Sequence, residues 1–253
     1  MHGLLYILFF ENQRNVNQEN VNEKNEKGST LLHRVVQKPN EYSPAIVSFL
    51  LKKGAIATTT TEDELGNQDK TALHIATQNM TDYSLDIVKI LSENNSPAVN
   101  VNDVGGKTPL HYAVVNKHES TPEIVCLLLE KGGDVNQTNE YGWTPLHLAV
   151  GNEHESAAEI VRLLLEKGAD VNLTDIDRRT PLLSAVQNKN ESYSLEIVLL
   201  LLKKGVNFYQ ADFDEYPLLY WVAVNKNEAA LEILRLLIEK GAYFSLKLRK
   251  RLI

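Results

Sequence analysis

Seven histidines are the side chains of this sequence best suited to binding a metal or transferring a proton. Four of them recur at one register of a repeated motif: His33, His74, His111 and His147. Two more, His118 and His154, stand beside Glu119 and Glu155 in matching polar segments. A zinc site needs three or four convergent ligands with short local spacings, and the sequence shows no such set. We therefore predict no metal ligand and no bound cofactor.

The other reactive side chains also lack the partners that catalysis needs. Cys126, the single cysteine, lies inside an apolar run, which indicates a buried and inert thiol. The acid pairs Asp175/Asp177 and Asp212/Asp214 lie in turn-rich segments, where short acidic side chains hydrogen-bond to backbone amides. No phosphate-binding glycine loop, nucleophile elbow or dinucleotide fingerprint occurs. We expect no catalytic residue and no enzymatic activity.

The composition is that of a soluble, mildly acidic protein. Of 253 residues, 43% are hydrophobic and 23% are charged, and the formal net charge is -7. Nucleic-acid binding needs clustered Lys and Arg, so we expect no nucleic-acid partner. No apolar stretch approaches the roughly 18 residues that span a bilayer, so no membrane contact is expected. One cysteine cannot form an internal disulfide, which fits a reducing, cytoplasmic location.

A short motif recurs along the chain and sets the position of four of the histidines. Copies begin at Thr30, Thr71, Thr108, Thr144 and Thr180, with a degenerate sixth at Pro217, at intervals of 36 to 41 residues. In the fourth copy Thr144 is a good helix N-cap and Pro145 suits the first helical position. An apolar run at helical spacing follows and ends at Gly168. This copy therefore predicts two helices, at about 145–152 and 157–167.

The pattern resembles the ankyrin repeat, whose signature is Thr-Pro-Leu-His-x-Ala, over roughly residues 4–245. The resemblance implies an all-α repeat solenoid of stacked helix-turn-helix units with short hairpin loops. It also implies that the motif histidines hydrogen-bond near the motif threonine and join neighbouring repeats. The period exceeds the usual 33 residues of the family, because the connector between the two helices is longer here.

We predict an organisation of complete and partial copies. Segment 1–21 is interpreted as the remnant second helix and loop of a truncated repeat. The copies are 22–62, 63–99, 100–135, 136–171, 172–208 and the degenerate 209–245, followed by a basic and apolar tail at 246–253. The tail could be a cap over the last helix pair, the trace of a truncated longer protein, or a targeting or membrane-contact segment. Pro217 replaces the capping threonine and Tyr220 the histidine, so we expect the sixth copy to fray first.

Positions that vary between copies while their neighbours stay the same are not held by packing between copies. The resemblance places them at the hairpin tips and on the inner, concave face, where partners dock. Aromatic residues and Arg, which are enriched at interface hot spots, occur there in successive copies. The candidates are Lys107, Glu140, Tyr141, Trp143, Ile176, Asp177, Arg179, Gln187, Phe213, Asp214 and Tyr216. Alternatively, the aromatic residues pack on the neighbouring hairpin. We expect an acidic surround from Asp175, Asp177, Asp212, Asp214 and Glu215.

These features predict a protein–protein interaction scaffold or adaptor that acts as a monomer and binds another protein. Two alternatives stay open at this stage. The chain could be the substrate-recognition arm of a longer effector or ubiquitin-ligase adaptor, or a decayed fragment without a partner. We expect it in the cytoplasm, or delivered into a host cell if its source is a symbiont, a pathogen or a virus.

Overall fold

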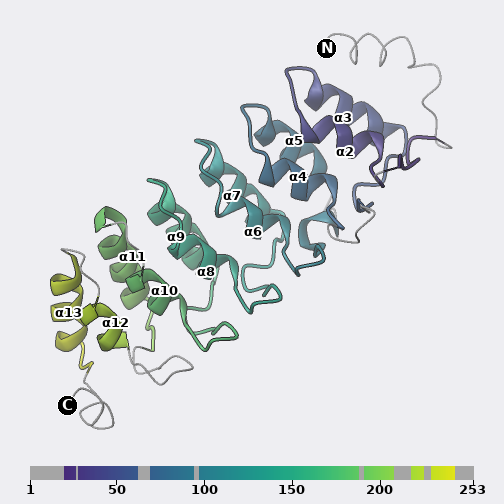
Figure 1. The fold of residues 1–253 in the computed structure, drawn as a ribbon. Helices are drawn as coiled ribbons and strands as arrows, with labels where there is room; N and C mark the ends of the chain where they lie inside the picture. Colours follow the sequence, from purple (N-terminus) through teal and green to yellow (C-terminus); the bar gives the residue numbers. More distant parts are fainter. Residues whose placement is uncertain are drawn as a thin grey trace. The chain divides into compact units, whose positions relative to one another are not determined.

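The protein is described by a computed structural model covering residues 20–26, 28–61, 69–93, 97–187, 191–207, 218–224 and 229–242, with the backbone alone at 187 and 191–194. Over these ranges the α-helices come in successive pairs and no strand occurs, as expected for an all-α repeat fold (Figure 1). The pairs are α2 (Leu31–Gln37) and α3 (Ser43–Lys52); α4 (Ala72–Gln78) and α5 (Ser84–Leu91); α6 (Pro109–Ala113) and α7 (Thr121–Glu130); α8 (Pro145–Val150) and α9 (Ala157–Glu166); α10 (Pro181–Gln187) and α11 (Glu191–Lys203); and α12 (Leu218–Val224) and α13 (Ala229–Glu239). A 3-10 turn, η2 (Pro97–Asn100), follows the second pair.

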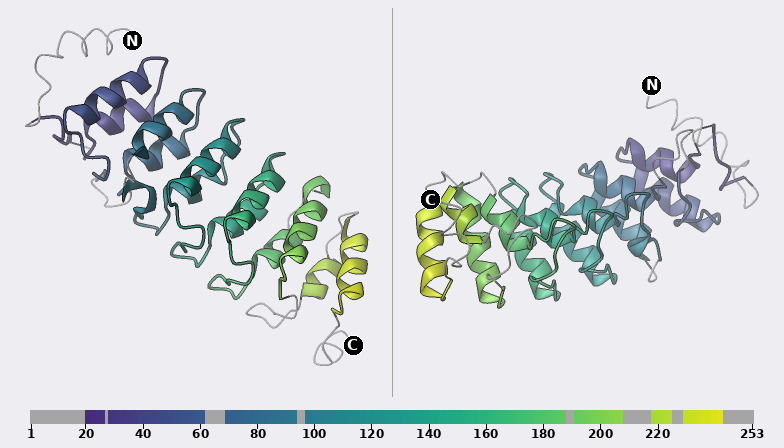
Figure 2. Two further views of the ribbon diagram at one scale, coloured as in Figure 1. Left: turned by 180° about the vertical axis from the view of Figure 1, so that it is seen from behind. Right: turned by 60° about the horizontal axis from the view of Figure 1, so that its bottom comes forward.

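The chain forms two compact units, Met1–Pro109 with Glu130–Gly132, and Leu110–Leu129 with Gly133–Ile253. In the first unit, α2 packs against α3 and α4, and α5 packs against α3 and α4. In the second unit, α10 lies between α8 and α12, and α11 lies between α9 and α13 (Figures 1 and 2). Each of these helices therefore contacts its own partner and the equivalent helix of an adjacent copy in the same unit.

In the first five copies the motif threonine directly precedes the first helix of its pair, as expected. Thr144 has an extended backbone and its hydroxyl accepts a hydrogen bond from the amide of His147, at 3.3 Å. Thr180 accepts from the amide of Leu183 in the same way, at 3.3 Å. The helices of the fourth copy end at Val150 and Glu166, two residues and one residue before the predicted ends. Helix ends fray, and boundaries vary by this amount.

In five of the six pairs described, a glycine in the left-handed conformation follows the second helix, and α5 is the exception. The φ angle of Gly168 is +88°, in the left-handed region that favours glycine, and the next amide, of Ala169, bonds back to the carbonyl of Leu164 at 3.0 Å. The isoleucine that opens the second apolar run belongs to the core in five copies and is fully buried at Ile124, Ile160 and Ile197, whereas Ile46 is half-buried. Within the part of the chain described, no helix is long and apolar enough to cross a membrane.

Candidate functional site

The motif histidines use both ring nitrogens, Nδ1 for the threonine of the same motif and Nε2 for a carbonyl farther along the chain. In the fourth copy, Nδ1 of His147 accepts from the backbone amide of Thr144 at 3.2 Å, and Nε2 donates to the carbonyl oxygen of Arg179 at 3.1 Å. Nε2 likewise contacts a carbonyl of the following copy for His74 with Lys107, at 2.9 Å, and for His111 with Trp143, at 3.0 Å. Nε2 of His33 contacts the carbonyl of Thr59, at the end of its own copy, at 2.9 Å. This confirms the structural role that the ankyrin resemblance implies.

These contacts require the neutral imidazole with its proton on Nε2. A carbonyl can only accept a hydrogen bond from Nε2, and a backbone amide can only donate one to Nδ1. Burial is the main cause that lowers the pKa of His33, His74 and His147 below the usual 6.5, although the carbonyl contacts act in the opposite direction. At neutral pH these histidines are therefore uncharged parts of the framework.

A second recurrent set of contacts uses asparagine, joins the two ends of a copy and was not predicted. Nδ2 of Asn136 donates to the carbonyl of Gly168 at 3.2 Å, and its Oδ1 accepts from the amide of Asp170 at 2.8 Å. Equivalent asparagines near the start of a copy contact the glycine turn near its end: Asn22 with Gly54 and Ile56, Asn100 with Gly132, and Asn172 with Asn207. The recurrent Val-Asn dipeptide was the signal in the sequence that could have revealed them.

The loops before the second helices contain His118 and His154, whose side chains act as local caps. Nδ1 of His118 lies 2.7 Å from Oγ of Ser120, and Nδ1 of His154 lies 2.9 Å from Oγ of Ser156. No group of three or more His, Cys, Asp or Glu side chains that could hold a metal ion occurs in the described ranges.

A short acidic or amide side chain closes the hairpins of the fourth and fifth copies. Oδ1 of Asp175 accepts from the amides of Asp177 at 2.9 Å and Arg179 at 2.8 Å. Asn139 does the same one copy earlier for the amides of Tyr141 and Trp143, at 2.9 and 3.0 Å. The turn-forming role predicted for Asp175 is confirmed.

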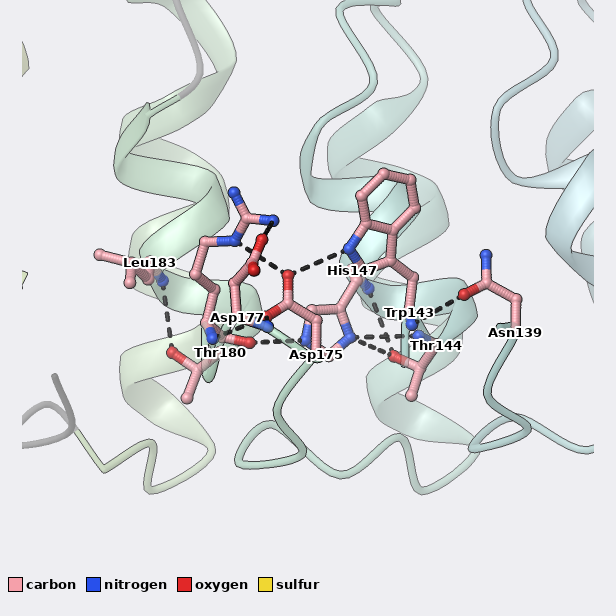
Figure 3. Close-up of polar contacts among 9 residues, drawn as sticks. Asn139, Trp143, Thr144, His147, Asp175, Asp177, Thr180 and Leu183 are labelled. Carbon is pink, nitrogen blue, oxygen red and sulfur yellow. Dashed lines mark hydrogen bonds and ion pairs between the residues drawn. The ribbon is translucent and has the colours of Figure 1, made fainter. Parts of the chain in front are cut away.

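Asp175 also joins two hairpins (Figure 3). Its Oδ2 accepts from the indole N–H of Trp143 at 3.0 Å and from Nε of Arg179 at 2.9 Å. The Asp175 side chain is 1% exposed, and Arg179 makes a second ion pair with Asp177. The expectation that Asp175 contributes to an acidic surface is therefore wrong. Its carboxylate is buried and neutralised by an arginine four residues later in the same hairpin.

The tips of the two hairpins also meet through their backbones. The amide of Ile176 donates to the carbonyl of Tyr141 at 3.1 Å. The φ angle of Gly142 is +72°, and a Cβ atom there would lie 3.0 Å from Cα of Asp175. Glycine is thus required at this position by both its backbone conformation and the neighbouring hairpin.

Apolar side chains remain exposed at these tips. Tyr141 is 44% exposed and its ring centroid lies 5.4 Å from that of Trp143, while Ile176 is 62% exposed. Glu140 is exposed, and its side-chain hydrogen bond raises the pKa of the Tyr141 hydroxyl. We call Tyr141, Trp143, Ile176, Asp177 and Arg179 the hairpin surface.

A groove lies beside the hairpin surface and has a volume of about 450 Å³. Its lining comes from the third, fourth and fifth copies. It includes Val115, Trp143, Leu148, Gly151, Arg179 and Ser184. We call it the Gly151 groove.

The structure brings six of the predicted site residues together: Glu140, Tyr141, Trp143, Ile176, Asp177 and Arg179. Lys107 belongs to the other compact unit, where its carbonyl binds His74. Gln187 is the last residue of α10 and only its backbone is described. Phe213, Asp214 and Tyr216 lie outside the described residues, as do Asp212 and Glu215. The sequence did not identify Asp175 as a site residue, because its carboxylate binds Trp143 of the preceding hairpin, a contact that only the fold creates.

Paired helices, hairpins and histidine contacts at a fixed register define an all-α repeat protein. A family model described as ankyrin repeats (3 copies) matches residues 2–97, 63–139, 83–175, 119–212 and 158–247. The chain therefore belongs to the ankyrin-repeat family. A comparison with curated proteins found no match. Ankyrin repeats generally serve as protein–protein interaction modules, and proteins built from them are typically binding scaffolds without enzymatic activity.

Proposed function

We propose that this protein is an interaction scaffold that binds another protein through the hairpin surface and the adjoining first helices of the third to fifth copies. The observation that carries the proposal is the arrangement around Trp143. Its indole is held by the buried Asp175, while the side chains of Tyr141 and Ile176 stay exposed beside it. Aromatic anchors whose conformation is fixed in advance lose little entropy on binding.

The hairpin aromatic residues have two interpretations, partner binding and packing on the neighbouring hairpin, and each is supported by different side chains. The N–H edge of Trp143 has a packing role, because it links its own hairpin to the next. Tyr141 and Ile176 link the hairpins through backbone atoms only, so their exposed side chains are not needed for that link. Contiguous exposed apolar side chains on a folded protein favour a binding role.

Several finer predictions belong to this proposal. The scaffold acts as a monomer in the cytoplasm, without catalytic residues or cofactors, and contacts neither nucleic acid nor a membrane. The net charge of -7 supports the exclusion of nucleic acid. Lys107, Gln187, Phe213, Asp214 and Tyr216 extend the proposed interface. The boundaries between copies are also proposed, and each copy from 22–62 to 209–245 contains one described helix pair.

The test is affinity capture with mass spectrometry, comparing the wild type with a Tyr141→Ser/Ile176→Ser variant. Leu231→Ser/Ile238→Ser is the matched control, because these α13 side chains are also exposed and apolar but lie outside the hairpin surface. We expect a protein that is captured by the wild type and the control and lost by the hairpin variant. Each variant must keep the cooperative thermal melt of the wild type. Equal capture by all three proteins would disprove the proposed site.

A further inference from the structure

We propose that the Gly151 groove receives one bulky apolar side chain from an extended segment of the partner. This inference rests on the proposed function and names the chemistry that the interface selects. The groove adjoins the hairpin surface through Trp143, which belongs to both. A partner segment that crosses Tyr141 can therefore place a side chain in the groove.

The space exists because the fourth copy has glycine where other copies have a side chain. The equivalent residues are Val115 in the third copy and Gln187 in the fifth. Gly151 has an ordinary φ of -87°, so its backbone does not require glycine. The nearest atom to an added Cβ would be the carbonyl oxygen of Leu148, at an unstrained 3.6 Å. A side chain at 151 would thus enter open space, and its absence leaves room for a side chain of a partner.

The main polar groups of the lining are already hydrogen-bonded within the protein. The indole N–H of Trp143 binds Asp175, and both ring nitrogens of His147 are used. Nδ2 of Asn152 donates to the carbonyl of Val114 at 3.0 Å, and its Oδ1 accepts from the amide of His154 at 3.0 Å. A polar occupant would lose its bonds to water and gain few in return, whereas an apolar occupant loses none.

The charges of the groove point to the same occupant, because its lining carries two positive and two negative side chains. Asp175 and Arg179 neutralise each other at 2.9 Å, and the other two, Lys117 and Glu153, are exposed and of opposite sign. The remaining wall includes the exposed apolar side chain of Val115 and the partly exposed ring of Trp143. A neutral, apolar side chain complements such a lining, and its burial contributes about 1.5 to 3 kcal/mol.

The probe is a displayed library of random peptides selected on the full chain. We expect the selected peptides to share one bulky apolar residue, such as Leu, Met or Phe, among variable neighbours. Gly151→Gln should weaken their binding at least tenfold, since it introduces the residue type of the fifth copy into the space. Glu159→Gln places the same side chain on α9, outside the groove, and should leave binding unchanged.

The controls separate this inference from the proposed function. Gly151→Gln must retain the wild-type melt, as its backbone conformation allows. Selected peptides that are lost with Tyr141→Ser/Ile176→Ser but bind Gly151→Gln normally would overturn the groove inference and leave the proposed site intact. Peptides that share a charged residue and no apolar one would overturn it too. If no peptide of the library binds the protein, the groove inference is overturned as well. The proposed function is tested separately, by the capture of a partner protein.

Discussion

The motif histidines keep one protonation state because both ring nitrogens have partners of fixed character. A backbone carbonyl accepts from Nε2, and a backbone amide donates to Nδ1, in the contacts of His74 and His147. A protonated ring would have to donate from Nδ1 toward an amide that is itself a donor. The histidine is therefore a connector between copies whose strength depends on pH.

Replacing His147 by leucine should destabilise the protein by about 2 kcal/mol, because it leaves the carbonyl of Arg179 and the amide of Thr144 without these bonds. Leucine already occupies the equivalent position, at Leu183, where it is buried, so its size is tolerated. Urea unfolding followed by circular dichroism measures the change. The control His154→Leu, in a half-buried loop, should cost less than about 1 kcal/mol. Equal losses would refute a special role for the motif position.

The lowered pKa values of His33, His74 and His147 make the stability depend on pH. Above the unfolded value of about 6.5 these histidines are neutral in both states, and their stabilisation is complete. As the pH falls below 6.5, these histidines bind protons in the unfolded chain but stay neutral in the folded chain. The free energy of unfolding therefore decreases. Each histidine contributes up to about 1.4 kcal/mol per pH unit.

Urea unfolding between pH 7 and pH 5 tests this linkage. We expect the stability difference between the wild type and His147→Leu to narrow as the pH falls, since the variant has one linked histidine fewer. Parallel curves for the two proteins would contradict the assignment of a neutral His147 in the folded state.

At the scale of elements, the hairpins of the fourth and fifth copies depend on each other. The amide of Ile176, in the fifth copy, donates a hydrogen bond to the carbonyl of Tyr141, in the fourth. The carboxylate of Asp175 accepts a second hydrogen bond between the same hairpins, from the indole of Trp143. The left-handed turn position holds Gly142 in the fourth copy and Arg178, with φ of 61°, in the fifth. Among the glycines whose surroundings are described, only Gly142 lies against the backbone of a neighbouring hairpin.

Gly142→Ala should therefore destabilise the protein by at least about 2 kcal/mol, since a left-handed conformation costs an alanine roughly 1–2 kcal/mol and its Cβ would press on Asp175. Gly151→Ala is the matched glycine control. It should change stability by less than about 1 kcal/mol, in the stabilising direction, because its φ is negative and its Cβ meets no close atom. Thermal melts of both variants measure this difference in stability. Similar melting midpoints would show that the contact between the hairpins contributes little to stability.

At the scale of the whole molecule, stability is distributed among contacts between adjacent copies. In each compact unit the helices pack on their own partner and on the neighbouring pair. A protein built in this way has local stabilities that depend on how completely each copy is covered. Ile238 of α13 is 53% exposed, whereas the equivalent Leu165 of α9 is 4% exposed.

We expect the amides of α12 and α13 to exchange with deuterium faster than those of α8 and α9. The reason is the less complete burial of α13, together with the loss of the threonine cap at Pro217. Hydrogen exchange resolved by mass spectrometry measures it on the intact chain. Greatest protection in α12 and α13 would overturn the prediction that the sixth copy frays first.

The helix pairs and the role of the motif histidines could be predicted because their determinants are local. Thr144, Pro145 and His147 lie within four residues, and the cap, the first turn and the Nδ1 contact all form inside that stretch. The partner of Nε2 came only from the family resemblance. Helix ends were less accurate, since the last turns of α8 and α9 depend on the loops that follow.

The sequence by itself determined the repeat register, the helix starts, the glycine stops and the set of variable positions, because each depends on neighbouring residues. Only the tertiary structure decided that Asp175 is buried, that asparagines bind the glycine turns, and that Gly151 opens a groove. These features join residues that are 32 positions apart in the sequence, such as Trp143 and Asp175 or Asn136 and Gly168. Their distances depend on how adjacent backbones stack, which the residue pattern within one copy does not specify.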